Sequence, residues 1–320
     1  MAEILSLPPG TTGVRPPTPL PYAPPASAGP SFDPLALLLA ETAAGHERAF
    51  ARLYELTGGR LVAIARGIVG RTDLAEEVLQ ESFLRIWRSA HQYDPGKGPA
   101  YAWLVTVVRN RALSAKAKTQ RLEHGHDELD DEKLVFDGPD PAAQAMRSEE
   151  ARRVNSCLAN LPLNHRKSVS LVYFEGLTHQ ELAQRLDVQL GTAKSWVRRG
   201  LAQMGQCLGN QADADWRARV AAEYAVGTLQ GAARRGFERR RERDARFCRS
   251  ADLWERQLAM LTEFLPDSGP APAHVWTRIE QRIARDRIAF SRPLFWQVAT
   301  GALTAVVLAL IAIVFAEGGR

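Results

Sequence analysis

The stretch LTHQELAQRLDVQLGTAKSWVRRGLAQM, from Leu177 to Met204, predicts two short helices joined by a tight turn. Thr178 can cap the first helix, and Glu181 stands three residues on as its partner in a capping box. Residues 187–191 predict the turn, because Asp187 tolerates the unusual backbone geometry that turns require. The buried face of the first helix is predicted at its apolar positions, Leu182, Ala183 and Leu186.

The second helix of this stretch is expected to turn Ala193, Val197 and Leu201 toward the first. Its outer side then carries cationic and hydroxyl side chains, Thr192, Lys194, Ser195, Arg198 and Arg199. Arg and Lys can bind guanine edges and phosphates in the major groove, and Thr and Ser can donate to either. The residue types favour a DNA-reading helix, and an ordinary helical hairpin with a solvated basic face is the alternative.

A second motif lies upstream, in DLAEEVLQESFLRIWRSAHQYDP, residues 73–95, and in GPAYAWLVTVVRNRALS, residues 98–114. The first part predicts a helix with an acidic and amide face, Glu76, Glu77, Gln80 and Glu81. The second part predicts a helix with basic residues, and Arg109 and Arg111 suit the backbone of a single strand. Trp103 suits either contact with an exposed base or burial as a core aromatic.

Together these motifs resemble the extracytoplasmic-function (ECF) sigma factors. Residues 161–204 resemble region 4, in which most members have Gly at the position of Asp187, and residues 73–114 resemble region 2. The resemblance implies that the outer residues of the second helix bind the promoter −35 element. It implies docking of the acidic face on RNA polymerase core, and contact with the −10 element through Lys97, Trp103, Arg109, Asn110 and Arg111.

The third block of the chain, residues 211–292, has a resemblance of its own. AAEYAVGTLQGAARRGFERR, from Ala221 to Arg240, is similar to the cytoplasmic domain of zinc-free, membrane-anchored anti-sigma factors. The resemblance implies an intramolecular contact that covers regions 2 and 4, at an effective concentration on the order of millimolar. Release would then require a partner protein that senses a signal, or a protease, for which we hypothesise a site between Asn210 and Arg292.

Residues 293–316 hold no charged side chain and predict a transmembrane helix, because about twenty apolar residues span a bilayer. The arginines before this run predict a cytoplasmic N-terminal side. The expected localisation is therefore the cytoplasmic side of the inner membrane as a single-pass protein, with the sigma part cytoplasmic after release.

The composition excludes several function classes. The chain has 320 residues and a net charge of +5, which permits a polyanion partner. It shows no carboxylate cluster, metal-ligand spacing or glycine-rich phosphate loop, so we expect neither an enzyme nor a cofactor or metal. Cys157, Cys207 and Cys248 lie far apart, which argues against a disulfide framework and suits a reducing cytosol.

The sequence therefore predicts an all-α chain of seven parts. They are a disordered Pro-rich tail (1–34), sigma region 2 (35–118), a flexible linker (119–150), the region 4 helix-turn-helix (151–210), an anti-sigma-like domain (211–292), a transmembrane helix (293–316) and a short external tail (317–320). Two alternatives remain open. One is a membrane-tethered helix-turn-helix activator that never joins polymerase, and the other is a constitutively active anchored sigma factor with a degenerate anti-sigma part.

Overall fold

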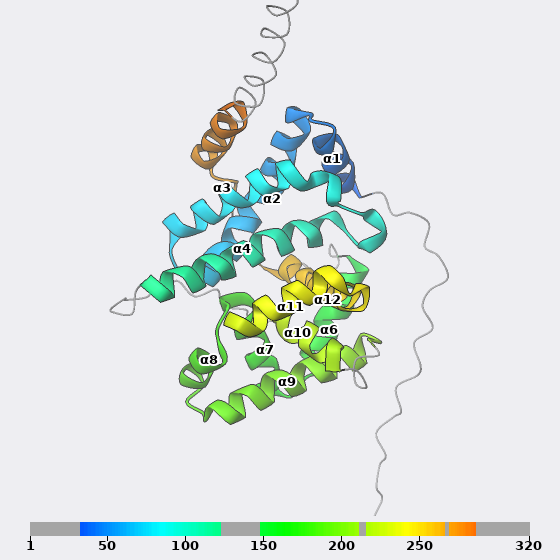
Figure 1. Cartoon of the computed structure of the whole chain (residues 1–320), viewed down its shortest axis with the longest axis vertical. Helices are drawn as coiled ribbons and strands as arrows, with labels where there is room; N and C mark the ends of the chain where they lie inside the picture. The colour runs from blue at the N-terminus through cyan, green and yellow to red at the C-terminus, as the bar shows by residue number, and fades with distance from the viewer. Residues whose placement is uncertain (1–32, 123–147, 211–215, 266–268, 286–320) are drawn as a thin grey trace, which may run out of the picture. The chain divides into compact units, whose positions relative to one another are not determined.

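The computed structural model describes residues 33–122, 148–210, 216–265 and 269–285, and over these ranges it is helical with no strand (Figure 1). This confirms the all-α prediction for the described part of the chain. The elements are α1 (Pro34–Ala43), α2 (Glu47–Val69), α3 (Thr72–Ser89), η1 (Ala90–Gln92), η2 (Pro95–Lys97), α4 (Ala100–Leu122), α6 (Glu149–Ala159), α7 (Leu163–Glu175), α8 (His179–Arg185), α9 (Leu190–Cys207), α10 (Trp216–Val226), α11 (Gly231–Arg243), α12 (Ala245–Ala259), η3 (Met260–Phe264) and a last helix of residues 273–285.

Helices α1 to α4 pack around one apolar core. Each places residues at helical spacing on its inner face, and the Phe50 and Phe83 rings of α2 and α3 meet with centroids 5.8 Å apart. Asp33 joins the first and last of these helices. Its Oδ1 accepts from the backbone N–H of Leu35, and its Oδ2 accepts from that of Ala100 at 3.0 Å. The start of α4 is therefore tied to the start of α1.

The helix-turn-helix lies in α8 and α9, as predicted. The capping box is present, because the Glu181 amide donates to Thr178 Oγ1 at 3.0 Å and the Thr178 amide donates to Glu181 Oε2 at 2.6 Å. Asp187 adopts a left-handed φ of 51° in the turn, which is the geometry that Gly provides most easily. Ala193 and Val197 of α9 are fully buried against the neighbouring helices.

A disulfide between Cys157 of α6 and Cys207 of α9 corrects the expectation from cysteine spacing. The two residues are 50 positions apart in the sequence, yet their Cα atoms are 5.8 Å apart. Helix packing brings them together, because α6 and α9 lie against each other. Spacing along the chain carries no information on such a contact, and only Cys248 is free among the described cysteines.

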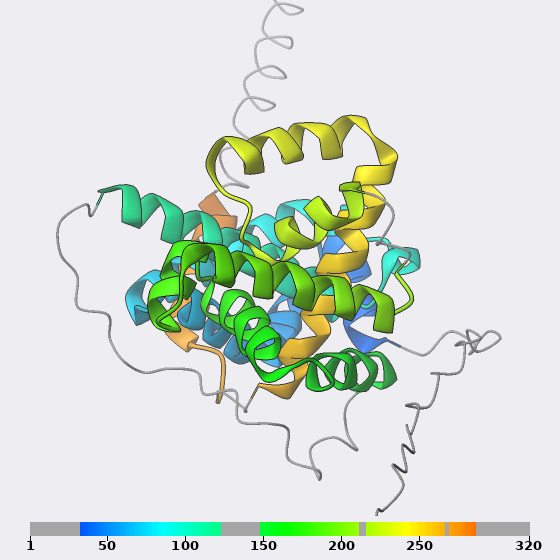
Figure 2. The ribbon, with the colours of Figure 1, turned by 90° about the horizontal axis from the view of Figure 1, so that it is seen from below.

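The described part of the third block, residues 216–265 and 269–285, packs on both sigma-like parts. Helices α10 and α12 lie side by side (Figure 2), α12 also contacts α4, and α10 contacts α9. The helix of residues 273–285, orange in Figure 1, lies against α2. There the Trp276 ring centroid is 5.6 Å from that of Phe50, and the Tyr54 hydroxyl donates to Pro272 O at 2.8 Å.

The prediction of a single-pass membrane protein is contradicted. Within the ranges that the structure describes, no helix is both long and apolar enough to cross a membrane. The longest described helices, α2 and α4, each carry several charged residues, whereas a span needs a continuous apolar run of about twenty residues. The run at 293–316 lies outside the described residues, as do the tail predicted at 317–320 and residues 1–32 of the tail predicted at 1–34. The last two residues of that first tail are ordered, because Asp33 caps α1 and Pro34 begins it. Of the predicted linker, 123–147 lies outside them and the ends are helical.

Candidate nucleic-acid interface

The outer face of α9 presents the side chains that the sequence singles out for DNA. Lys194, Arg198 and Arg199 are exposed, and Thr192 and Ser195 are half-buried. The face is set by the burial of Ala193, Val197 and Leu201, because residues one position away on a helix point about 100° around its axis. The helix therefore offers cations and hydroxyls along one side, as a major-groove reader requires.

The cap of α8 is bound to α4 by an ion pair and a hydrogen bond. Glu181 lies 3.6 Å from Lys116 Nζ and accepts from Gln120 Nε2 at 2.8 Å. Burial raises the pKa of the Glu181 carboxyl, but Lys116 and the Thr178 amide outweigh burial, so the pKa is lowered overall. Because the folded-state pKa is depressed, the carboxylate stabilises the fold above the pKa of an unfolded Glu. That stabilisation is lost as the pH falls through the lowered value.

Glu181→Gln is therefore expected to lower the free energy of unfolding by about 1 kcal/mol at pH 7. The difference from wild type should shrink below about pH 4, where the carboxyl of the unfolded chain is protonated. Urea unfolding of the full chain at pH 7 and pH 3.5 measures both values. Glu77→Gln, at an exposed position of α3, is the matched control. If Glu181→Gln lowers the free energy of unfolding equally at both pH values, the charge of the Glu181 carboxylate does not stabilise the fold.

Arg109 of α4 does not lie on the surface, although the sequence predicts that it holds a DNA strand. Only 4% of the residue is exposed, and its guanidinium donates to Tyr173 O at 3.2 Å, Ala225 O at 2.7 Å and Val226 O at 2.6 Å. These oxygens belong to the last turns of α7 and α10, where helix carbonyls lack partners within the helix. Burial lowers the pKa of Arg109 to about 10, so the guanidinium stays charged at neutral pH. Its positive charge interacts favourably with the partial negative charge at the C-termini of both helices.

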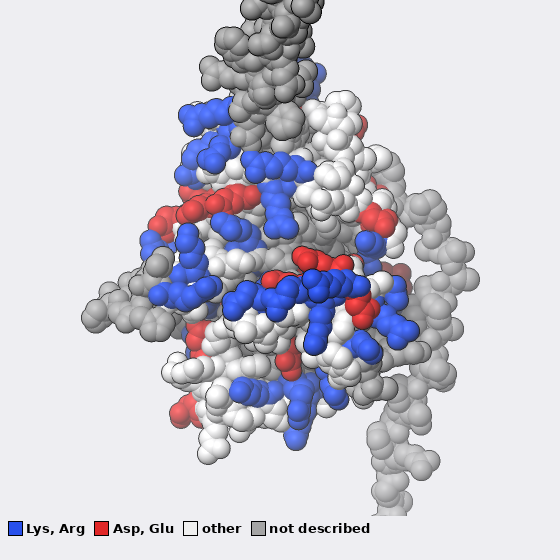
Figure 3. Space-filling model, viewed as in Figure 1, with Lys and Arg blue, Asp and Glu red and all other residues white. Residues whose placement is uncertain are grey.

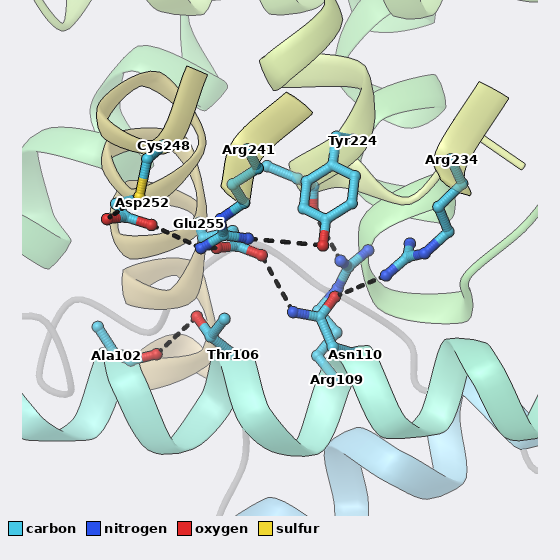
Figure 4. A network of polar contacts seen from close by, with 11 residues as sticks. Ala102, Thr106, Arg109, Asn110, Tyr224, Arg234, Arg241, Cys248, Asp252 and Glu255 are labelled. Carbon is cyan, nitrogen blue, oxygen red and sulfur yellow. Dashed lines mark hydrogen bonds and ion pairs between the residues drawn. The ribbon is translucent and has the colours of Figure 1, made fainter. Parts of the chain in front are cut away.

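Asn110, the next residue, joins α4 to a polar network of the third block (Figure 4). Its amide nitrogen donates to Glu255 Oε1 at 3.0 Å, and its oxygen accepts from Arg234 at 3.2 Å. Arg241 completes the network through Glu255 at 2.9 Å and Asp252 at 2.5 Å. Burial opposes the charge of Arg241, but Glu255 and Tyr224 outweigh burial and raise its pKa. A residue predicted for promoter contact is thus held by α11 and α12.

The other residues predicted for the −10 element lie between η2 and the middle of α4. Lys97 is exposed, and its carbonyl accepts from Arg256 of α12. Trp103 is half-buried with its ring centroid 6.0 Å from that of Tyr93, which leaves it partly accessible. Arg111 is exposed and forms an ion pair with Glu81 of α3. A predicted strand-binding cation and a predicted polymerase-binding carboxylate therefore neutralise each other here.

The acidic face of α3 is partly covered. Glu76 Oε2 lies 2.7 Å from His274 Nε2 and 3.3 Å from Arg278 Nη2, both on the helix of residues 273–285. Glu77 is exposed, and Gln80 and Glu81 are half-buried. The described part of the third block therefore contacts the predicted polymerase surface at Glu76.

The sequence did not indicate how closely the two sigma-like parts pack. Lys116 Nζ of α4 donates to Glu175 O at 3.1 Å and to Gly176 O at 3.2 Å, at the end of α7. A Cβ on Gly176 would lie 2.9 Å from Ile68 of α2, so the close approach depends on this glycine. Among the described residues, no group of His, Cys, Asp and Glu could hold a metal ion.

Comparison with known proteins identifies the family of the chain. Residues 53–122 match Sigma-70 region 2, and residues 151–204 match Sigma-70 region 4. The ECF RNA polymerase sigma factor SigK of Mycobacterium bovis (strain BCG / Pasteur 1173P2) is 35% identical over 171 residues, 52% of this chain and 89% of the relative. The chain belongs to the ECF RNA polymerase sigma factor family.

A second SigK relative agrees with this membership. SigK of Mycobacterium ulcerans (strain Agy99) is 33% identical over 176 residues, 55% of this chain and 94% of the relative. Among solved structures, "Structure of CnrH in complex with the cytosolic domain of CnrY" matches at 23% identity over 56% of this chain and 99% of the other, with a TM-score of 0.27. The sigma factor is a non-enzymatic transcription initiation factor that directs RNA polymerase to promoters.

Proposed function

We propose that the third block of this sigma factor acts as a built-in anti-sigma domain that holds regions 2 and 4 in a closed, inactive arrangement. The observation that carries the proposal is the burial of Arg109 under α10, with hydrogen bonds of 2.7 and 2.6 Å to Ala225 O and Val226 O. A guanidinium with all of these contacts cannot bind a DNA strand at the same time.

We further propose the promoter and polymerase contacts that this arrangement controls. The −10 element is bound through Lys97, Trp103, Arg109, Asn110 and Arg111. The −35 element is read by Thr192, Lys194, Ser195, Arg198 and Arg199. RNA polymerase core binds Glu76, Glu77, Gln80 and Glu81. In the closed arrangement the residues proposed for the −10 element make the most contacts with the rest of the chain. The residues proposed for the −35 element make the fewest.

Helices α10 and α12 of the third block also lie beside α9, the helix that we propose reads the −35 element. A small cavity marks where α9 meets α10 and α12, and its lining includes Arg198, Glu223 and Trp254. Burial raises the pKa of Glu223, and Arg198 is the strongest influence that lowers it. A carboxylate is therefore close to a cation that we assign to DNA, and it competes with phosphate for that cation.

Distance along the promoter also favours a closed, inactive state. Elements centred at −10 and −35 are about 25 base pairs apart, which is about 85 Å of duplex at about 3.4 Å per base pair. Regions 2 and 4 are in direct contact here, through Lys116 Nζ and Glu175 O at 3.1 Å. Reading both elements requires the regions to separate, and α12 opposes separation because it contacts both α4 and α6.

Covalent connection makes this inhibition efficient. An intramolecular partner acts at an effective concentration on the order of millimolar, so even a modest affinity keeps the surfaces covered. Release then needs a change in the third block itself, either cleavage between Asn210 and Arg292 or the binding of another protein.

Run-off transcription with core polymerase tests the proposal directly. We compare the full chain with a fragment that ends at Asn210, at equal concentrations of protein and promoter. Only the fragment should initiate efficiently, and added residues 211–285 should inhibit it in trans. Equal initiation by both proteins would mean that the third block is degenerate as an inhibitor. Binding of the fragment to core polymerase, measured in parallel, separates a failure of inhibition from a misfolded fragment.

A further inference from the structure

A groove of about 770 Å³, open to solvent, lies between helices α10, α11 and α12. The proposed autoinhibition does not use this groove. Its floor is aromatic and aliphatic, with Trp216, Val220, Phe237 and Phe247 among the lining residues. The rings of Trp216 and Phe247 meet at 5.4 Å, and those of Phe237 and Phe247 at 5.5 Å. Trp216 is 45% exposed, which is a large apolar area for a side chain to leave in water.

Arginines of α11 border this groove. Arg239, Arg240 and Arg243 line it and are exposed, and none of them has an ion pair with another described residue. Lys and Arg side chains gather over the middle of the face in Figure 3, where α11 lies in the same view. Asp244 also lines the groove, but its carboxylate accepts from the Arg246 amide at 2.8 Å and caps α12. The rim therefore attracts an anionic partner.

The shape of the groove fits a helix. Its α11 wall runs from Ala233 to Arg243, which is about 15 Å at 1.5 Å per residue and matches about three turns of a partner helix. Two small residues, Ala233 and Gly236, lie on this wall. A Cβ added to Gly236 would meet only Arg239 Nη2, at 4.0 Å, so the space beside it is open. Small residues let a second helix approach closely.

We propose that this groove binds an acidic amphipathic helix of a partner protein. Its apolar side chains lie on the aromatic floor, and its carboxylates face the three arginines of the rim. This is the helix-in-groove mode, in which apolar anchors at positions i, i+3, i+4 and i+7 supply most of the affinity. The inference does not depend on whether the third block inhibits transcription.

The full chain can be tested with a defined probe. The probe is a fluorescein-labelled 18-residue peptide with Leu and Phe at i, i+3, i+4 and i+7 spacing and Glu at the other positions. Fluorescence anisotropy should show saturable binding. Gly236→Leu should weaken it at least about tenfold, because the new side chain fills the groove. The same substitution raises helix propensity, so α11 should stay folded. Arg239→Glu with Arg243→Glu should weaken binding similarly, and Arg235→Glu, exposed on the same helix outside the groove, should not.

Four results would overturn the proposal. Equal binding to wild type and Gly236→Leu would show that the groove is not the site. Equal binding of a peptide with Lys in place of Glu would show that the carboxylates are not recognised. An equal loss of peptide binding with Arg235→Glu would show general electrostatic attraction to α11 and no specific site in the groove. Binding of anionic phosphatidylglycerol vesicles in the absence of peptide binding would assign the arginines and Trp216 to a lipid surface instead.

Discussion

Arg109→Met is expected to lower the free energy of unfolding of the sigma factor by about 3 kcal/mol. The substitution keeps an unbranched side chain but removes the guanidinium that donates to Tyr173 O, Ala225 O and Val226 O. All three carbonyls lie in the last turns of helices, so they lose the partner that the helices themselves cannot provide. The contact of the guanidinium with the Tyr173 ring, at 4.2 Å, is lost as well.

Urea unfolding followed by circular dichroism measures this effect on the full chain. Arg111→Met, two residues along the same helix, is the matched control, because it removes an exposed ion pair and should cost less than about 1 kcal/mol. Arg109→Lys should fall between the two, since one ammonium cannot reach three carbonyls on two helices. If Arg109→Met unfolds at the same urea concentration as Arg111→Met, the buried guanidinium does not hold α4, α7 and α10 together.

Loss of the Cys157–Cys207 disulfide should have an effect of similar or greater size, about 4 kcal/mol. The bond closes a loop of 50 residues, which contains α7, α8 and most of α9. Its main contribution is to restrict the unfolded chain, and the restriction grows with the length of the loop. Leu158 and Met204 beside the bond are buried by helix packing, so region 4 should keep its fold at a lower stability without the bond.

The double variant Cys157→Ser/Cys207→Ser and the wild type with dithiothreitol should show the same loss in urea unfolding. Cys207 lies at an exposed position, so the reductant can reach the bond. Cys248→Ser, which removes the free thiol, should behave as wild type in both conditions. A double variant as stable as oxidised wild type would mean that the helix contacts alone supply the stability of region 4.

Local features were predictable from the sequence because they depend on neighbours along the chain. The capping box of Thr178 and Glu181, the turn at Asp187 and the buried face of α9 all follow from spacings of one to four residues. Family membership was predictable for the same reason, since the motifs of regions 2 and 4 are short and continuous. The outer face of α9 was therefore correctly placed before its contacts were known.

Contacts between distant segments were decided only by the tertiary structure. The sequence of α4 presents Arg109 as a cation for DNA, but packing of α7 and α10 buries it. Cysteine spacing argued against the Cys157–Cys207 bond, and helix packing formed it. The groove beside α11 needs three helices to exist. Periodicity specifies which face of a helix is apolar, but the partner of that face depends on the free energy of the whole packed arrangement, to which every helix contributes.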